Sequence, residues 1–251
     1  MGLGIDQRLP GPFLPDLWAP GRYNRSMDAS LNIVQTLAVW ALPVIFAITL
    51  HEVAHGWVAR SLGDTTAYKL GRLSLNPLRH VDPVGTVLVP GMLLALGGGF
   101  LFGWAKPVPV DWRNFRKPRT DMALVAVAGP LSNLAMAIAW GLLFKIAAGT
   151  GAHEGVWFGL TLMGRAGMLI NISLMVLNLL PLPPLDGSRV LMGVLPPRTA
   201  FHYAKLERYG MLILILLVIP IGGSSILSKI MYWPFVLSYV GISHLLGITP
   251  V

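Results

Sequence analysis

The chain contains no cysteine among its 251 residues, so disulfide bonds and thiolate metal ligands are excluded. Any metal ion must be held by histidine, aspartate, glutamate or asparagine. Charged residues are also scarce, at 12% of the chain against roughly 25% in soluble domains. With 54% hydrophobic residues and a mean hydropathy of +0.65, the composition predicts an integral membrane protein that crosses the bilayer several times.

Acidic residues are fewer than basic ones, and the formal net charge is +8. In a soluble protein this excess would suit nucleic acid, but here the basic residues cluster in short loops between apolar runs. Cytoplasmic loops of membrane proteins carry such an excess of Lys and Arg. We therefore expect a lipid bilayer and no nucleic acid as a partner, with loops 59–82, 105–121 and 183–208 on the cytoplasmic side.

The apolar runs set the predicted organisation, because about 20 apolar residues suffice to cross a bilayer. We predict an all-α polytopic membrane protein with helices at about 30–61, 122–148 and 163–182, and two more within 209–246. The last two are separated by a break at Pro220-Ile221-Gly222-Gly223. The expected division is a flexible or interfacial arm at 1–30, a core at 31–208, and C-terminal helices at 209–251.

Two segments after the first helix are less regular. Residues 65–82 alternate as a β-strand does, and Gly71 and Asn76-Pro77 are turn signals, so we predict a short membrane-associated strand or hairpin. Residues 83–104 are apolar but interrupted by Gly and Pro. Irregular backbone at membrane depth is tolerated only where it is buried in protein or lines a cavity. A re-entrant segment and a true span both fit, and the basic loops on either side favour re-entry.

The first apolar helix ends in a chemical motif, His51-Glu52-Val53-Ala54-His55. Residues four apart lie on one face of a helix, so the two imidazoles can hold one metal ion. The glutamate between them can reach a metal-bound water and act as a general base, as in zinc metalloproteases. Ionisable groups in a membrane span are costly, and the default hypothesis for them is a functional site.

A catalytic zinc site usually has three protein ligands, so this motif leaves one ligand to find. Asp186 lies where the span at 163–182 reaches the predicted cytoplasmic side, the side of His51 and His55. A plain helix-ending Asp-Gly turn explains Asp186 equally well on its own. However, Zn²⁺ with ionised Asp186 and Glu52 sums to zero charge, which is far cheaper to bury than isolated charges. The four remaining histidines lie mostly in hydrophilic loops: His80, His153, His202 and His244.

Three separated stretches together resemble a known family. They are HExxH at 51–55, Ala128-Gly129-Pro130-Leu131-Ser132-Asn133, and the run from Asn178 to Gly187 that reads NLLPLPPLDG. In this order they resemble the site-2 proteases, which are intramembrane zinc metalloproteases, in a short form without PDZ or CBS domains. Stretches 75–83 and 102–110 resemble short bacterial and archaeal members. The resemblance covers about residues 46–191.

The resemblance implies a role for each matching position. His51, His55 and Asp186 would bind zinc, Glu52 would be the catalytic base, and Asn133 would help to position the substrate chain or its carbonyl. We also expect Asn76 and Lys106 to contact the substrate. The implied reaction is hydrolysis of peptide bonds in or near transmembrane helices of other proteins, in a bacterial or archaeal cell membrane with the site towards the cytoplasm.

Several alternatives remain open from the sequence. A non-catalytic intramembrane metal carrier or receptor would use the His and Asp ligands without needing Glu52. A prenyl-protein endopeptidase would be expected to use a later glutamate ligand in an apolar helix, and Glu154 and Glu207 do not fit that place. Asn133 could instead form a hydrogen bond between helices. His80 and Asp82 could cap their loop or line a substrate route.

Overall fold

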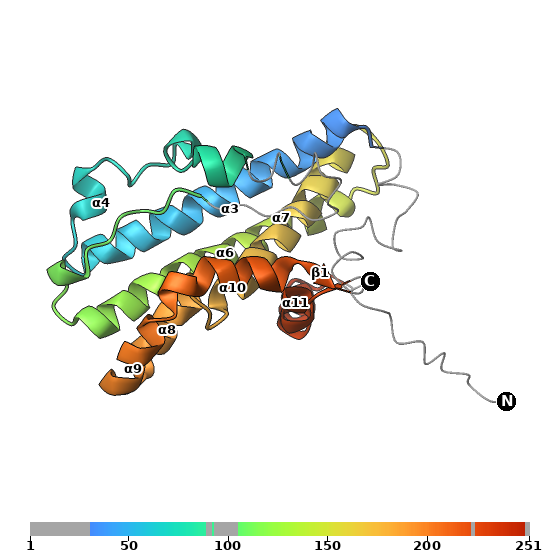
Figure 1. The fold of residues 1–251 in the computed structure, drawn as a ribbon. Helices are drawn as coiled ribbons and strands as arrows, with labels where there is room; N and C mark the ends of the chain where they lie inside the picture. The colour runs from blue at the N-terminus through green and yellow to red at the C-terminus, as the bar shows by residue number, and fades with distance from the viewer. Residues whose placement is uncertain (1–30, 89–91, 93–104, 222–223, 249–251) are drawn as a thin grey trace.

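The computed structural model describes residues 31–88, 92, 105–221 and 224–248, and this part of the chain is almost entirely helical (Figure 1). Four helices are long and apolar enough to cross a membrane. Their bounds are α3 (Ile33–Ser61), α6 (Pro118–Ala148), α7 (Gly155–Leu179) and α11 (Ile226–Leu246). The shorter helices are α4 (Thr66–Lys69), α8 (Asp186–Val194), α9 (Pro197–Ala204) and α10 (Glu207–Val218). The predicted all-α polytopic class is thus confirmed at the level of four candidate membrane helices.

Local signals set both ends of α3. The Asn32 side chain accepts a hydrogen bond from the Gln35 backbone N–H at 2.9 Å, and the Gln35 side chain accepts one from the Asn32 N–H, which is a capping box. The helix then runs 29 residues to Ser61, and Gly63 follows with a positive φ of 112°. Its last three turns carry the motif predicted to bind a metal ion.

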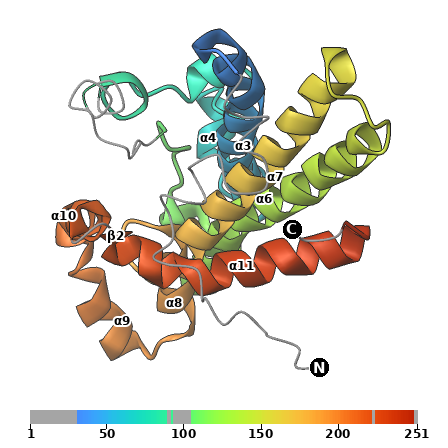
Figure 2. The ribbon, with the colours of Figure 1, turned by 90° about the vertical axis from the view of Figure 1, so that its right-hand side faces the viewer.

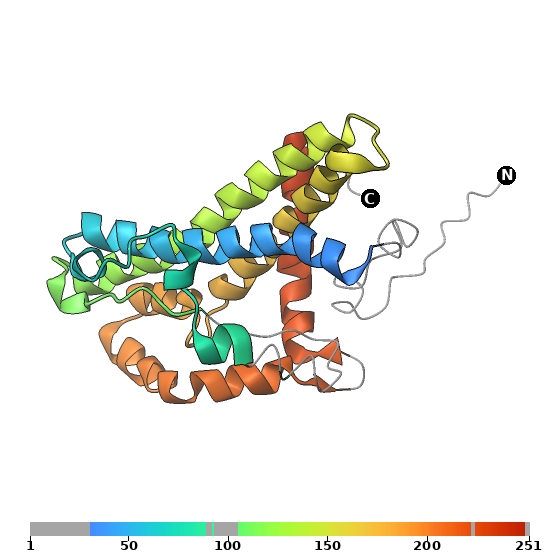
Figure 3. The ribbon, with the colours of Figure 1, turned by 90° about the horizontal axis from the view of Figure 1, so that it is seen from above.

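Helices α3, α6 and α7 lie side by side (Figures 1 and 3). Small residues let α6 and α7 approach closely: a Cβ added at Gly164 would lie 2.6 Å from the Phe144 backbone N, and one at Gly167 would collide with the Trp140 ring. Close approach through small residues is a main source of helix association in membranes, because lipid gives no hydrophobic driving force between helices. This packing holds α6 close against α7.

The C-terminal half completes a second layer. After α7 the chain turns through the prolines at 181–184 into α8, α9 and α10, and α11 then runs across the direction of α3 (Figures 2 and 3). The largest buried apolar cluster joins α7 to these helices and includes Met168, Ile172, Leu214, Phe235 and Leu246. Helix α10 has only 12 residues, fewer than a bilayer crossing requires. The predicted break within 209–246 is confirmed, because α10 ends at Val218 and α11 begins at Ile226.

The predicted β hairpin at 65–82 is wrong. These residues form α4 and a 3₁₀ turn, η1 (Pro77–Arg79). The reason is local: Asp64 accepts hydrogen bonds from both the backbone N–H and the hydroxyl of Thr66, which satisfies a donor at the start of α4 and favours a helical turn. Among the described residues the only strands are β1 (Pro220–Ile221) and β2 (Ser224–Ser225), which pair antiparallel far along the chain.

Other predicted boundaries shift or fall outside the structure. Helix α6 begins at Pro118, four residues before the predicted start, since proline suits the first position of a helix. Helix α7 begins at Gly155 rather than at 163, so residues 155–162, between two predicted helices, are also helical. Of the segment 83–104, Pro83–Leu88 forms a helical turn (η2), and the choice between re-entry and a span lies outside the described residues, as does the arm at 1–30.

Candidate metal centre

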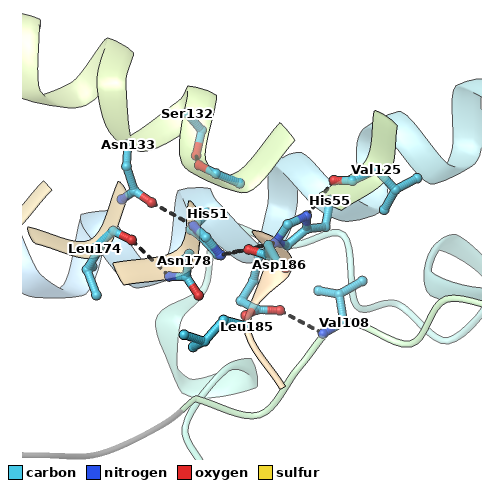
Figure 4. A network of polar contacts seen from close by, with 12 residues as sticks. His51, His55, Val108, Val125, Ser132, Asn133, Leu174, Asn178, Leu185 and Asp186 are labelled. Carbon is cyan, nitrogen blue, oxygen red and sulfur yellow. Dashed lines mark hydrogen bonds and ion pairs between the residues drawn. The ribbon is translucent and has the colours of Figure 1, made fainter. Parts of the chain in front are cut away.

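Helix α3 presents two buried imidazoles on one face. His51 and His55 are one helical turn apart, each only 8% exposed, and their ring centroids lie 4.6 Å apart with the rings nearly perpendicular. Their Nε2 atoms are 3.0 Å apart (Figure 4). The i, i+4 spacing therefore does what the sequence predicted, since it brings both Nε2 atoms to one point.

Asp186 comes to the same point from α8. Its Oδ2 lies 3.1 Å from the His51 Nε2 and 3.2 Å from the His55 Nε2, so these three residues form a group that could hold a metal ion. A metal ion binds a carboxyl group in its ionised form, so Asp186 would act here as a carboxylate.

The structure shows why Gly follows Asp186. A Cβ added at Gly187 would lie 2.5 Å from the Leu179 carbonyl carbon and would also collide with the carbonyl oxygens of Leu179 and Leu180. The first turn of α8 is therefore packed directly on the end of α7. This close approach brings the carboxylate of Asp186, in the first turn of its helix, to the imidazoles of α3.

The hydrogen bonds of the imidazoles define their chemistry. The His55 Nδ1 lies 2.7 Å from the Val125 carbonyl oxygen, which can only accept, so this nitrogen carries a proton. The His51 Nδ1 likewise lies 2.6 Å from the Asn133 Oδ1. In a neutral imidazole a protonated Nδ1 leaves a lone pair on Nε2, which is the usual arrangement of metal-binding histidine.

Three electron-rich atoms thus converge, two Nε2 lone pairs and the Asp186 Oδ2. Within the described residues, this buried oxygen has no hydrogen-bond donor. Such a convergence is stable only around a positive charge. The separations of 3.0 to 3.2 Å are close to the ~3.3 Å between ligands of a tetrahedral zinc site with bonds of about 2.0 Å, so the residues fit zinc.

Helix α6 passes against the metal side of these rings. A Cβ added at Gly129 would lie 2.5 Å from the Cε1 atoms of both His51 and His55. Only glycine leaves room for the imidazoles here, so α6 packs directly against the candidate ligands at Gly129. No sequence pattern specified that contact.

Glu52 is held by a segment that the sequence analysis did not connect to it. One of its carboxylate oxygens, Oε2, accepts a hydrogen bond of 2.8 Å from the backbone N–H of Val108. Val108 is flanked by Pro107 and Pro109, which have no N–H, so it is the one backbone donor within 107–109. The Val108 side chain is itself buried on α3, next to Gly56.

Residues 105–111, which include Val108 and are called the 105–111 segment below, are held in place by Asp64. It is 1% exposed, and its carboxylate accepts hydrogen bonds of 2.8 Å from the Asp111 N–H and the Asn114 side chain, besides those from Thr66. Burial opposes ionisation, but these hydrogen bonds outweigh it and lower the pKa of Asp64. Sequence reasoning missed this role, because Gly63-Asp64 looks like a plain helix end.

The other predicted substrate residues lie differently. Asn76 caps η1, where its side chain accepts the Leu78 N–H at 3.0 Å, and the Lys106 side chain is exposed. Neither forms a hydrogen bond or ion pair with the three-residue group in the described part of the chain, and their roles stay predictions. Asn133 is fully buried and touches His51.

His80 and Asp82 make the contacts of loop-capping residues. The His80 Nε2 lies 2.9 Å from the Ser74 carbonyl oxygen, and its own carbonyl accepts the Lys106 N–H at 2.9 Å. The Asp82 carboxylate accepts the N–H groups of Val84 and Gly85 at the start of η2. These contacts favour a role for His80 and Asp82 in capping their loop over a role in lining a substrate route.

Two histidines and a carboxylate at one point, with the glutamate of an HExxH helix beside them, define the class of zinc metalloproteases. A sequence profile of Peptidase family M50 matches residues 143–221, which include Asp186. The chain is also 41% identical over 185 residues to the protein named "Putative zinc metalloprotease YwhC" of Bacillus subtilis, covering 72% of this chain and 81% of the relative. The chain belongs to peptidase family M50, and the predicted membership of the site-2 proteases is confirmed.

More distant relatives extend this similarity. Two are named Rip2 and MJ0611 and carry the same zinc metalloprotease description. Identity to Rip2 of Mycobacterium tuberculosis H37Rv is 31% over 234 residues, or 92% of this chain and 83% of the relative. Identity to MJ0611 of Methanocaldococcus jannaschii is 28% over 171 residues, or 66% of this chain and 82% of the relative. No solved structure matches this chain significantly.

Proposed function

We propose that this protein is an intramembrane zinc metalloprotease that hydrolyses peptide bonds in or near transmembrane helices of other membrane proteins. The observation that carries the proposal is the convergence of His51, His55 and Asp186 beside Glu52, at the end of a helix apolar enough to cross a membrane. Protein substrates are implied by the family. The position of the site within α3, a helix apolar enough to cross a membrane, supports a transmembrane substrate.

In this proposal His51, His55 and Asp186 hold zinc, which would polarise the scissile carbonyl and acidify the attacking water. Glu52 accepts the proton of that water as a C–O bond forms. It then gives the proton to the nitrogen of the leaving amine as the C–N bond breaks. Since the Val108 N–H holds Oε2, the other carboxylate oxygen, Oε1, is the atom that exchanges protons.

A substrate helix must unwind before it can react, because its own hydrogen bonds hide its carbonyls. The 105–111 segment lies against Glu52 and could pair with the unwound chain by β-addition. Pro107 and Pro109 have no N–H, so a substrate would bind this segment mainly through its own N–H groups. Lys106 and Asn76, the two predicted substrate residues, would flank that path.

The proposed site faces the cytoplasm. The basic residues of loops 105–121 and 183–208 lie at the ends of α6 and α7 that are near the metal group, and positive loops are typically cytoplasmic. This orientation makes the 31–208 core a unit that opens to the cytoplasm of a bacterial or archaeal cell. The helices after residue 209 would then pack around that core.

The Val108 contact gives a testable prediction. Val108→Pro removes the N–H that holds Glu52 and is expected to lower kcat about 10- to 100-fold, the usual cost of losing an outer-shell hydrogen bond. Zinc affinity should stay near the wild-type value, since none of the three candidate ligands is changed. The measurement is steady-state cleavage beside a zinc titration.

Val108→Ala is the matched control, because it keeps the backbone N–H and shortens only the side chain. It should retain most of the wild-type kcat. If both variants lose kcat equally, then the Val108 side chain matters and its N–H does not.

The proposed function is tested with purified protein in liposomes and a model transmembrane substrate. The wild type is expected to bind one zinc ion and to cleave, a strong chelator to abolish cleavage, and zinc to restore it. Asp186→Ala removes a candidate ligand, so its zinc affinity should fall by more than about 100-fold. Losing a residue that only hydrogen-bonds to a ligand typically costs about 10- to 100-fold. Glu207→Gln, which changes an exposed carboxylate, should bind and cleave as the wild type does. Cleavage that survives complete removal of metal would refute the proposal.

A further inference from the structure

A chain of side-chain amides runs from the metal group into α7. The His51 Nδ1 lies 2.6 Å from the Asn133 Oδ1, and the Asn133 Nδ2 donates to the Asn171 Oδ1 at 2.9 Å. Both asparagines are 0% exposed. The chain therefore connects three candidate membrane helices, α3, α6 and α7, through buried polar groups alone.

Backbone carbonyls fix the direction of this chain. The Asn171 Nδ2 donates to the Gly167 carbonyl oxygen at 2.8 Å, so the Asn171 Oδ1 must face Asn133. The Asn133 Nδ2 donates to this oxygen and, at 3.3 Å, to the Ala47 carbonyl oxygen. Both amides are thus oriented, and the Asn133 Oδ1 faces His51 as an acceptor.

This direction sets the tautomer of His51. An acceptor at Nδ1 requires the proton on that nitrogen, which leaves the Nε2 lone pair towards Asp186 and His55. If the Asn133 amide were reversed, its NH₂ group would face Nδ1 and favour the proton on Nε2. Such a ring could not bind a metal ion through Nε2.

We propose that Asn171 is a positioning residue for the metal centre and acts on His51 through Asn133. It touches neither the metal ligands nor the substrate; it holds the Asn133 amide in the orientation that makes His51 a ligand. The proposal rests on the metal site of the proposed function. It also gives Asn133 a role towards His51 in place of the predicted contact with substrate.

The competing role is ordinary helix packing, since buried Asn pairs hold membrane helices together. A packing residue changes the stability of the protein when it is removed and leaves the intrinsic zinc affinity unchanged. A positioning residue changes the zinc affinity of the folded protein. The two roles are separated by measuring zinc affinity, by competition with a chelator, beside the melting temperature of the metal-free protein.

Asn171→Leu removes the acceptor and keeps the number of side-chain heavy atoms. The Asn133 amide then keeps only the longer bond to Ala47 and can rotate, so the zinc dissociation constant is expected to rise about 10- to 100-fold. Asn133→Leu should weaken zinc binding at least as much. The double variant should bind zinc no more weakly than Asn133→Leu alone, because Asn171 acts through Asn133.

Asn171→Asp is the rescue variant. A buried carboxyl in this apolar setting stays protonated, and it offers one acceptor to Asn133 and one donor to Gly167, as the amide does. It should bind zinc more tightly than Asn171→Leu. Ser173→Ala is the matched control on α7, because in the described part of the chain the Ser173 hydroxyl donates to the Leu169 carbonyl of its own helix and to no other group.

Two outcomes would overturn the proposal. In one, Asn171→Leu lowers the melting temperature but keeps the zinc dissociation constant within about twofold of the wild type, a change under about 0.4 kcal/mol. In the other, the effects of Asn133→Leu and Asn171→Leu on zinc affinity add. Failure of the proposed protease function is seen separately, as a wild type that binds zinc and does not cleave.

Discussion

Replacing Glu52 with glutamine is expected to lower proteolysis about 100-fold or more while the protein keeps its zinc. Glutamine has nearly the same shape, and its carbonyl oxygen can still accept the Val108 N–H. It cannot accept a proton from water. General base catalysis contributes about 10²- to 10⁴-fold, so cleavage should fall by that amount. The measurement is single-turnover cleavage in liposomes together with zinc content.

Glu154→Gln is the control for this prediction. Glu154 is one of only three glutamates in the chain, and it is exposed beside the start of α7. Its replacement should leave both zinc content and cleavage unchanged. A Glu52→Gln variant that functions like the wild type would instead indicate a metal carrier or receptor, the class that needs the ligands without the base.

Gly129→Ala is expected to destroy the metal centre without changing any ligand. The new Cβ would lie 2.5 Å from the Cε1 atoms of His51 and His55, so both rings must move or α6 must shift. Zinc affinity should fall more than about 100-fold, which exceeds the usual effect of losing one residue that hydrogen-bonds to a metal ligand. Alanine is a better helix former than glycine by about 1 kcal/mol, so the loss would not come from a weaker helix.

The control for this prediction is Gly159→Ala in α7, where an added Cβ meets nothing within 4 Å. That variant should bind zinc and cleave as the wild type does. Zinc titration and helical content, measured by circular dichroism, test both variants. If Gly129→Ala binds zinc within threefold of the wild type, the close packing of α6 against the ligands is wrong.

The sequence predicted the candidate metal group because its chemistry depends on local spacing. HExxH needs only one helical turn to bring two imidazoles together, and Asp186 stood out as an acidic residue where a span ends among prolines. The same reasoning placed the long helices, because each is a long apolar run. Their starts were less accurate, since apolar residues such as those at 156–160 fit a helix or a membrane-surface loop equally well.

The parts that sequence reasoning missed depend on contacts between distant segments. The β hairpin at 65–82 was wrong because alternation was counted while the cap that Asp64 provides was not. The hydrogen bond to Glu52 comes from a backbone N–H, which no side-chain pattern encodes. Asn171 looks like any polar residue in an apolar helix until its neighbours across α6 are known.

Within the described residues, one face of α6 makes the hydrogen bonds to the Nδ1 atoms of the two candidate histidine ligands and packs against their rings. The Val125 carbonyl contacts His55, Gly129 packs on both rings, and Asn133 contacts His51, and these three residues follow one another at intervals of four. A rotation or a one-residue slip of α6 would disturb all three contacts together. Metal affinity is therefore a readout of how α6 is seated against α3. Zinc would bind correctly assembled protein in preference to misassembled forms, so its binding would favour the assembled helices at equilibrium.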